Sequence, residues 1–482
     1  MQSAIIEGPI IARMLPTLRA LCAFLFILGH TCGARGATQD LPAEVAAALT
    51  RAKLPLDAVS VLVVDAEGKG APRVSHRAGV PVNPASVAKL VTTYAALELL
   101  GPAFTWSTPV YVEGTVEAGT LTGNLYVQGQ GDPKLVVERL WLLLRRVQGL
   151  GVRHITGDIV LDRTAFATVA QDPAAFDGQP LRPYNAAPDA LLLNFKSVVM
   201  TFVPDGTGHA QIEYEPALSG VQMTSSVPLV AGECNDWRGT LNADFSNPAR
   251  FVFAGGYPAA CGERAWPVAY ADPTTYAVRA VAGAWADMGG KLGGQVREGK
   301  VPPSLRPAFT MQSPALSEVI RDINKYSNNV MAQQLFLTLS LQQNSAGTLE
   351  GSRQIVRSWW RERVGGEPPQ IDNGSGLSRE DRITAQQLAS MLRLAWASPL
   401  MPELVSSLPV AGTDGTLKQL RSRFAGQAHL KTGSLRDVSA VAGYVHGASG
   451  KRYVLVAIAN HAGAAAARPA IDALIDWTAR DK

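Results

Sequence analysis

The segment Pro84-Ala85-Ser86-Val87-Ala88-Lys89 opens an apolar run that continues to Leu100 and stops at Gly101-Pro102. Apolar residues recur along this run at spacings of three and four, which predicts a helix. Residues three apart share one face of a helix, so the Lys89 amine can reach the Ser86 hydroxyl. A serine hydroxyl is a weak nucleophile until a base accepts its proton, and a lysine whose pKa is lowered by burial is such a base. The spacing alone also fits a helix-capping serine beside a solvated lysine.

A second motif, Ser327-Asn328-Asn329, lies in a polar stretch between two helix-like segments, 315–324 and 330–341. A second serine near the first can relay a proton between Lys89 and a leaving group, and the Asn329 amide can hold a substrate carbonyl. Ser and Asn are also favoured helix caps, so this motif alone does not establish a site.

A third motif, Lys431-Thr432-Gly433-Ser434, lies in the first of three strand-like runs near the C-terminus, 429–435, 438–446 and 453–460. A substrate backbone can pair along such a strand, and the glycine keeps that approach clear. Lys431 supplies a positive field, while Thr432 and Ser434 supply hydroxyls for a carboxylate. The backbone N–H groups of Ser86 and Ser434 can stabilise an oxyanion. The plainer interpretation of this motif alone is a turn with a solvated lysine.

The three motifs together change the interpretation. Ser-x-x-Lys, Ser-x-Asn and Lys-Thr-Gly, in this order on a helix, an interhelix loop and a strand, resemble the signature of penicillin-binding proteins and class A β-lactamases. The interval between Ser86 and Ser327 is far longer than a compact β-lactamase needs. The sequence is similar to the class C low-molecular-mass penicillin-binding proteins, a serine DD-carboxypeptidase/DD-endopeptidase family of the bacterial periplasm whose extra domains separate these two motifs. Further matches are Gly129–Pro133, Asp372–Arg379 and Gly412–Leu417.

The resemblance implies a role for each motif residue. Ser86 is then the acylated nucleophile and Lys89, crowded by Lys431, is the base. Ser327 and Asn329 are the relay and the substrate clamp, and the substrate-binding residues of the strand are Lys431, Thr432 and Ser434. The substrates implied are peptidoglycan stem peptides, and β-lactam antibiotics are expected to acylate the same serine. No cofactor is implied.

Composition excludes several other classes of protein. Hydrophobic residues make up 47% of the 482 residues and charged residues 17%, which excludes an intrinsically disordered chain. The balance of 44 basic against 40 acidic residues argues against a nucleic-acid partner, which calls for a concentrated basic patch.

The N-terminus predicts export to the periplasm. Arg13 and Arg19 precede the short apolar run 21–28, and small residues follow at 33–37, as in a secretory signal peptide covering residues 1–36. The apolar run is too short to span a membrane, so no membrane span is expected. Met14 is a plausible alternative start.

Removal of that segment leaves two cysteines, Cys234 and Cys261, separated by glycine-rich turns. In an exported chain this pair predicts one disulfide. Neither Cys-x-x-Cys nor His-Glu-x-x-His occurs, so no metal site is indicated.

The order of secondary-structure signals predicts an α/β (α+β) fold with an interrupted catalytic domain. Residues 38–102 and 273–482 are expected to form one discontinuous domain, an antiparallel sheet flanked by helices. Residues 103–272 alternate short β-rich runs, such as Gly123–Val127 and Ala190–Phe202, with turn residues. They predict one or two inserted β-rich subdomains.

Alternatives remain open from the sequence. Tyr326-Ser327-Asn328 also reads as Tyr-x-Asn, the second motif of class C β-lactamases and related esterases, and a catalytically silent cell-wall scaffold is a further possibility. The loop Asp372–Arg379 is either a structural turn or a border of the substrate groove, whereas Trp359-Trp360 is expected to pack inside a helix layer. Carboxypeptidase or endopeptidase preference and the oligomeric state do not follow from the sequence.

Overall fold

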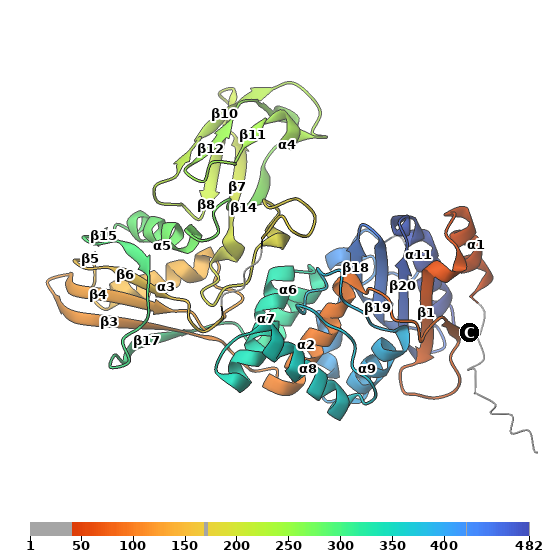
Figure 1. Cartoon of the computed structure of the whole chain (residues 1–482). Helices are drawn as coiled ribbons and strands as arrows, with labels where there is room; N and C mark the ends of the chain where they lie inside the picture. Colours follow the sequence, from red (N-terminus) through yellow and green to blue (C-terminus); the bar gives the residue numbers. More distant parts are fainter. Residues whose placement is uncertain (1–40, 168–171, 421, 482) are drawn as a thin grey trace, which may run out of the picture. The chain divides into compact units, whose positions relative to one another are not determined.

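The computed structural model describes residues 41–481, apart from 168–171 and 421 (Figure 1). The predicted signal peptide, residues 1–36, and the alternative start at Met14 lie outside the described residues. Within the described part, no helix has both the length and the apolar character needed to cross a bilayer.

A five-stranded antiparallel sheet joins the N-terminal and C-terminal parts of the described chain. Its strand order is β18-β19-β20-β1-β2, and β1 pairs along its whole length with β20. The three runs near the C-terminus are therefore strands, as predicted, and the structure shows that they are neighbours in one sheet. The strand bounds are β1 (Val59–Asp65), β2 (Val74–His76), β18 (Ala428–Leu435), β19 (Val438–His446) and β20 (Arg452–Asn460).

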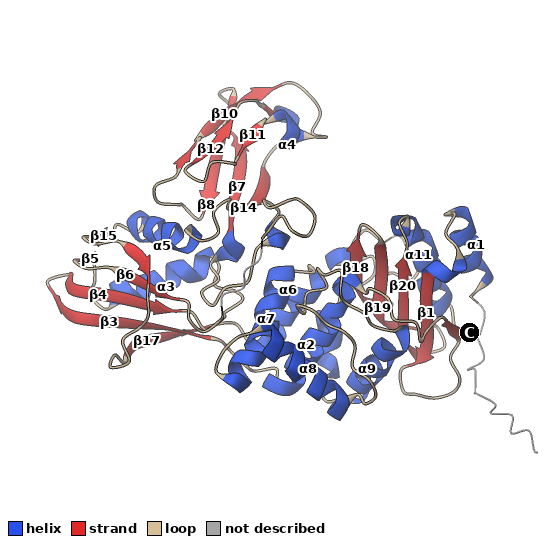
Figure 2. Ribbon diagram, viewed as in Figure 1, coloured by secondary structure: helices blue, strands red, loops and turns tan. Residues whose placement is uncertain are grey.

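Helices cover both faces of this sheet (Figure 2). In β20, Val454, Val456 and Ile458 join the core beneath one helical layer, whereas Leu455 and Ala457 join the core with α1 and α11. Both faces of β20 are buried, which explains its continuous apolar sequence. The layer on the first face contains α2 and α7, which begin at the last residues of the first and second motifs. The helix bounds are α1 (Ala43–Arg51), α2 (Lys89–Leu100), α6 (Leu316–Lys325), α7 (Asn329–Asn344), α8 (Leu349–Arg363), α9 (Ala385–Ala397), α10 (Met401–Ser407) and α11 (Arg468–Ala479).

Between α2 and α6 the chain builds a second hydrophobic core around another sheet. The order of this sheet is β15-β5-β4-β3-β17, with β6 paired to β4 and β16 paired to β6. Two amphipathic helices, α3 and α5, contribute their apolar sides to the same core. The bounds are β3 (Ser107–Glu117), β4 (Thr120–Gln128), α3 (Val137–Gly149), β5 (His154–Ile155), β6 (Ile159–Asp162), α5 (Tyr276–Asp287), β15 (Lys291–Leu292), β16 (Val296–Glu298) and β17 (Pro307–Gln312).

Residues between β6 and α5 form two smaller sheets, β13-β10-β8-β7-β14 and β11-β12-β9. Phe202 of β7 stacks on Tyr257 with ring centroids 5.3 Å apart. Cys234 and Cys261 form a disulfide with their Cα atoms 4.9 Å apart. The bounds are β7 (Ser197–Pro204), β8 (His209–Glu215), β9 (Gln222–Met223), β10 (Ser226–Val230), α4 (Trp237–Thr240), β11 (Ala243–Asp244), β12 (Arg250–Phe253), β13 (Tyr257–Pro258) and β14 (Arg264–Ala269).

The sheet pairing differs from the expected domain boundary at residue 272. The elements α5, β15, β16 and β17 follow that residue, yet β15 pairs with β5, β16 with β6 and β17 with β3. The apolar periodicity after Pro273 predicts the helix α5 but not which core the helix faces. We therefore propose that the insertion spans 103–312 and that the catalytic domain comprises 41–102 and 313–481.

The predicted strand Ala190–Phe202 also differs from the structure, because only its second half forms β7. Asn194, Phe195 and Lys196 have φ values of 39°, 55° and 53°, in the left-handed region that a strand does not use. This turn places the Lys196 amine 2.9 Å from the buried carboxylate of Asp189. The ion pair is a tertiary contact that strand propensity does not predict.

Replacing both Cys234 and Cys261 with serine is expected to lower the free energy of unfolding of the insertion by about 3 kcal/mol. A cross-link between residues 27 apart restricts the unfolded chain, so its loss favours unfolding. Urea titration of the wild type and the double variant, followed by tryptophan fluorescence, measures the difference. Coincident transitions of the double variant and the wild type with its disulfide intact would contradict this role for the disulfide.

Candidate active site

Ser86 lies in a tight turn that precedes α2. The turn is a single 3-10 segment, Ala85–Ala88, and Ala85 has a left-handed φ of 48°. The Ala85 N–H donates to Oδ1 of Asn83 at 2.8 Å. Asn83 in turn exchanges two hydrogen bonds with Asn460 at the end of β20. The central sheet therefore holds the turn that carries Ser86.

The Lys89 amine is fully buried and is surrounded by three oxygen atoms. Its Nζ lies 2.9 Å from Ser86 Oγ and 2.6 Å from Asn329 Oδ1, and it also donates to the Ser375 carbonyl. The amide and backbone carbonyl oxygens only accept hydrogen bonds. A neutral amine has two N–H groups for these two acceptors, which leaves its lone pair for the Ser86 hydroxyl.

The electrostatics of the site favour that neutral form. Burial, followed by repulsion from Lys431, holds the pKa of Lys89 well below its usual range, while Asp381 acts in the opposite direction. Lys431 is itself fully buried, and burial lowers its pKa to about 7. Two buried amines close together do not both carry a full charge at neutral pH, so Lys89 is available as a base.

Ser327 and Lys431 meet on the other side of the site. Ser327 lies between α6 and α7 with a left-handed φ of 58°, and its Oγ accepts a hydrogen bond from the Lys431 amine at 2.9 Å. The same amine donates to the Thr432 carbonyl at 2.7 Å. The hydroxyl oxygens of Thr432 and Thr416 are 2.7 Å apart. A second serine and a second lysine are thus paired within the same buried region.

The Lys-Thr-Gly motif runs along an edge of the central sheet. β18 is the outer strand, and the N–H of Leu430 donates outward to the Pro409 carbonyl at 2.9 Å. Because a strand has a period of two residues, Thr432 and Ser434 direct their N–H groups to the same outer side. An extended substrate can pair with such an edge.

Gly433 brings this edge next to Ser86. A Cβ at position 433 would lie 2.5 Å from the Pro84 carbonyl oxygen and 3.2 Å from the Ser86 nitrogen. Glycine is therefore required for this approach of strand and turn. The arrangement fits an oxyanion hole formed by the N–H groups of Ser86 and Ser434.

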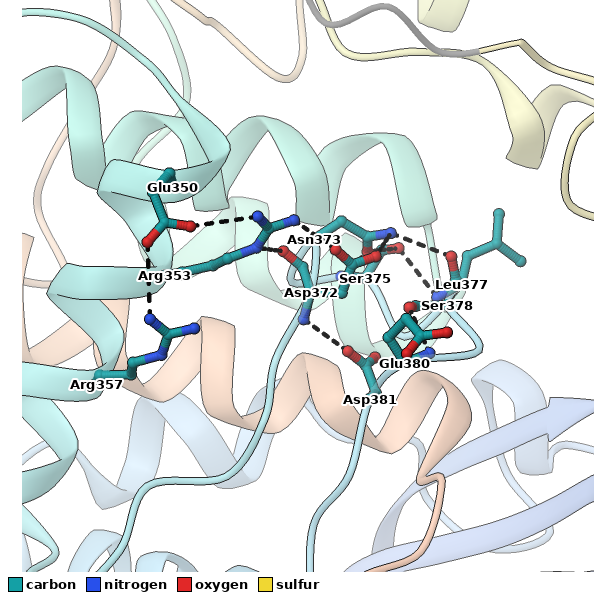
Figure 3. Close-up of polar contacts among 10 residues, drawn as sticks. All are labelled: Glu350, Arg353, Arg357, Asp372, Asn373, Ser375, Leu377, Ser378, Glu380 and Asp381. Carbon is teal, nitrogen blue, oxygen red and sulfur yellow. Dashed lines mark hydrogen bonds and ion pairs between the residues drawn. The ribbon is translucent and has the colours of Figure 1, made fainter.

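The loop Asp372–Arg379 packs against the Ser86 turn. A Cβ at Gly376 would lie 2.0 Å from the Ala85 carbonyl oxygen, and Gly376 has a left-handed φ of 76°. The side chain of Asn373 accepts hydrogen bonds from the Ser375 N–H at 3.0 Å and from the Ser375 hydroxyl at 2.7 Å (Figure 3). The loop thereby presents the Ser375 carbonyl to Lys89, a structural role that sequence reasoning did not assign.

The insertion contacts helix α7. The Asn329 amide, which the sequence predicts as a substrate clamp, donates to the Tyr184 carbonyl at 3.3 Å. Farther along α7, the buried Gln334 side chain accepts from the Asp189 N–H at 2.7 Å and donates to the Asp189 carbonyl at 2.8 Å. The loop Asp372–Arg379 also contacts the insertion, because the Arg379 guanidinium lies 4.9 Å from the ring centroid of Phe176. Tyr184 and Gln334 were not predicted as site residues.

Tyr326 and the tryptophan pair have different environments. Tyr326 is 71% exposed, whereas Ser327 next to it contacts Lys431. The Tyr-x-Asn interpretation needs the Tyr326 hydroxyl in the site, and the structure places the Ser327 hydroxyl there instead. Trp359 and Trp360 are 3% and 1% exposed and belong to the helical core, as expected.

Comparison with solved structures identifies the fold. The crystal structure of penicillin binding protein 4 from Haemophilus influenzae matches with a TM-score of 0.70 and 20% identity, covering 89% of this chain and 99% of that chain. A predatory endopeptidase from Bdellovibrio bacteriovorus matches with a TM-score of 0.52 and 16% identity, covering 88% and 95%. The predicted fold class is confirmed.

Sequence comparison then gives the family. A D-alanyl-D-alanine carboxypeptidase from an Actinomadura species is 28% identical over 432 residues, which cover 85% of this chain and 79% of the relative. The model of the D-Ala-D-Ala carboxypeptidase 3 (S13) family matches residues 41–481. The chain belongs to this family of serine-type peptidases, which confirms the predicted relationship.

The Gly376→Ala variant is expected to lose β-lactam acylation and at least about 2 kcal/mol of stability, because its Cβ collides with the turn that positions Ser86. Gly365→Ala is the matched control. Gly365 also has a left-handed φ, 84°, but no atom lies within 4 Å of the added Cβ. The control should lose only about 1 kcal/mol and acylate normally. Acylation rates and thermal unfolding test both variants, and equal behaviour would refute the close-approach argument.

Proposed function

We propose that the chain is an exported D-Ala-D-Ala carboxypeptidase and DD-endopeptidase that acts on peptidoglycan stem peptides through an acyl-enzyme at Ser86. One observation carries this proposal: a fully buried lysine amine lies 2.9 Å from the hydroxyl of Ser86. Family membership supplies the D-Ala-D-Ala substrate.

Acylation begins when Lys89 accepts the Ser86 proton. Ser86 Oγ then bonds to the carbonyl carbon of the penultimate D-alanine, and the N–H groups of Ser86 and Ser434 stabilise the oxyanion. When the tetrahedral intermediate collapses, the C–N bond breaks and Ser327 passes its hydroxyl proton to the leaving amine. Ser327 takes in return the proton held by Lys89, which goes back to its neutral form. The amine is D-alanine in carboxypeptidase action and a cross-bridge amine in endopeptidase action. Water then hydrolyses the ester and restores the Ser86 hydroxyl.

Lys431 and Thr432 bind the carboxylate of the terminal D-alanine in this proposal. The Lys431 cation lies at the edge strand, and the Thr432 hydroxyl is adjacent to that of Thr416. β-Lactams combine a strained amide with a carboxylate, which resembles the terminal dipeptide of the substrate. They are therefore expected to acylate Ser86 covalently.

The alternatives are less well supported. A β-lactamase or esterase that uses Tyr326 needs the phenol at the site, but Tyr326 is 71% exposed. A silent scaffold has no need for a fully buried Lys89 hydrogen-bonded to Ser86, because burying a lysine is unfavourable. Neither alternative explains the described contacts as well.

The proposed location is the periplasm. The Arg13 and Arg19 region and its apolar run have the pattern of a signal peptide. The Cys234–Cys261 disulfide fits an oxidising compartment.

Ser86→Ala and Lys89→Ala are each expected to abolish release of D-alanine almost completely. Nucleophile and base act as a unit, so the double variant should be little slower than either single variant. Mass analysis of stem-peptide products measures the rates. Thr50→Ala, a change at an exposed position of helix α1, provides a folded control. Turnover by the Ser86→Ala variant at the wild-type rate would show that another nucleophile acts.

Lys431→Ala is expected to reduce kcat/KM by roughly 10- to 100-fold more for a peptide with a free terminal carboxylate than for its amidated counterpart. In the wild type, the preference for the free carboxylate should decline as the pH rises above about 7, because Lys431 then loses its charge. The ratio of the two kcat/KM values across pH measures both effects. A ratio that is independent of pH would contradict carboxylate binding by Lys431.

A further inference from the structure

Asp381 is a buried carboxyl group that the proposed reaction does not use. Its side chain is fully buried, and its Oδ1 accepts a hydrogen bond from the Asp372 N–H at 2.7 Å (Figure 3). Its Oδ2 is buried and has no hydrogen-bond partner among the described residues. A carboxylate that leaves one oxygen unpaired in a protein interior is unfavourable unless it serves a purpose or carries a proton.

The contact with Asp372 connects Asp381 to the loop that supports Lys89. Asp372 begins this loop, and Ser375, three residues further on, offers its carbonyl to the Lys89 amine. Arg353 of α8 binds both the carbonyl of Asp372, at 2.7 Å, and its carboxylate, at 2.5 Å. Asp381 therefore fixes the loop from one side while Arg353 fixes it from the other.

The charges that face Asp381 come from three segments. Asp372 repels its negative form, whereas Lys89 and Arg382 attract it. The negative charge of Asp372 is compensated by Arg353, but no ion pair holds Asp381 itself in the described chain. Burial dominates these effects and raises the pKa of Asp381 to about 7.

The interaction with Lys89 is reciprocal. A negative Asp381 raises the pKa of Lys89, and a positive Lys89 lowers the pKa of Asp381. Lys431 acts on Lys89 in the opposite direction to Asp381. The two buried groups are thus coupled: the ionisation of one favours the ionisation of the other.

We infer that Asp381 is a positioning residue that both orients the acceptor loop of Lys89 and supplies a counter-charge when Lys89 accepts the Ser86 proton. This inference rests on the proposed role of Lys89 as the base. The proton moves from Ser86 Oγ to Lys89 Nζ, which becomes a cation, and a carboxylate at Asp381 stabilises that cation. No proton passes directly between Asp381 and Lys89. Asp381 contacts no reacting atom and acts only through Lys89.

The Asp381→Asn variant separates the two parts of this role. The side-chain oxygen of asparagine still accepts from the Asp372 N–H, so the loop keeps its support, but the counter-charge is removed at every pH. Glu380→Gln is the matched control, because it makes the same chemical change at the adjacent, exposed residue.

The experiment measures the second-order rate of acylation by a chromogenic cephalosporin across pH. In Asp381→Asn, Lys89 loses its stabilising anion, so the acid limb of the profile moves to lower pH. The rate on the alkaline plateau falls by about threefold to tenfold, because the base is weaker. Glu380→Gln should reproduce the wild-type profile, and the thermal midpoint of Asp381→Asn should be equal to or above that of the wild type.

The outcomes are distinguishable. Failure of the wild type to be acylated would overturn the proposed function, whereas normal acylation with superimposable Asp381→Asn and wild-type profiles would overturn only this inference. A uniform loss of rate at all pH values, with an unshifted limb, would assign Asp381 a purely structural role and also overturn the counter-charge.

A second measurement uses the wild-type protein and does not depend on folding of the variant. Carbon NMR of protein labelled at aspartate carboxyl groups should show a buried carboxyl that titrates near pH 7, as expected for Asp381. Its midpoint should change when Ser86 is acylated and Lys89 no longer faces a free hydroxyl. If no aspartate that titrates near neutral pH responds to acylation, Asp381 is not coupled to Lys89.

Discussion

Burial of the Lys89 amine is the constraint on which the rest of the site depends. An ammonium ion removed from water without a counter-ion in direct contact is unfavourable by several kcal/mol, so the amine is driven towards its neutral form. The neutral amine then needs acceptors for two N–H groups and a partner for its lone pair. Asn329, Ser375 and Ser86 supply these from three separate parts of the chain.

This requirement brings together segments that are far apart in the sequence. Ser86 is held by the end of β20 through Asn83, and Gly433 allows β18 to approach the same turn. The insertion interrupts the domain but is held to it by Gln334. This residue belongs to α7, the helix that begins with Asn329. The structure thus connects the insertion to the helix whose first residue contacts Lys89.

The sequence brings forward the side chains that the structure places together, because the chemistry proposed for them restricts both residue type and spacing. Ser86 and Lys89 must share a helix face, and a strand buried on both sides, such as β20, has a continuous apolar sequence. Ser375 was not predictable as an acceptor, because it acts through a backbone carbonyl that every residue possesses. The sequence alone does not distinguish Asp381 from its neighbour Glu380, because both carry a carboxyl group. Only the structure shows that Asp381 is buried and Glu380 exposed.

The domain boundary and the strand around Ala190 show a second limit of the sequence. The apolar periodicity of α5 predicts that one side of the helix faces a core. It does not predict which of the two cores that is. The left-handed turn at Asn194 brings the Lys196 amine to the buried carboxylate of Asp189, a contact that strand propensity does not predict. Tertiary interactions decide both features.

The most direct test of the account is to identify the covalent intermediate. The enzyme is mixed with a stem peptide ending in D-Ala-D-Ala and quenched in acid within milliseconds, and its proteolytic fragments are then weighed by mass spectrometry. The account predicts a fragment containing Ser86 that is heavier by the mass of the acyl group, the substrate without its terminal D-alanine. An acyl group on any other residue would contradict it.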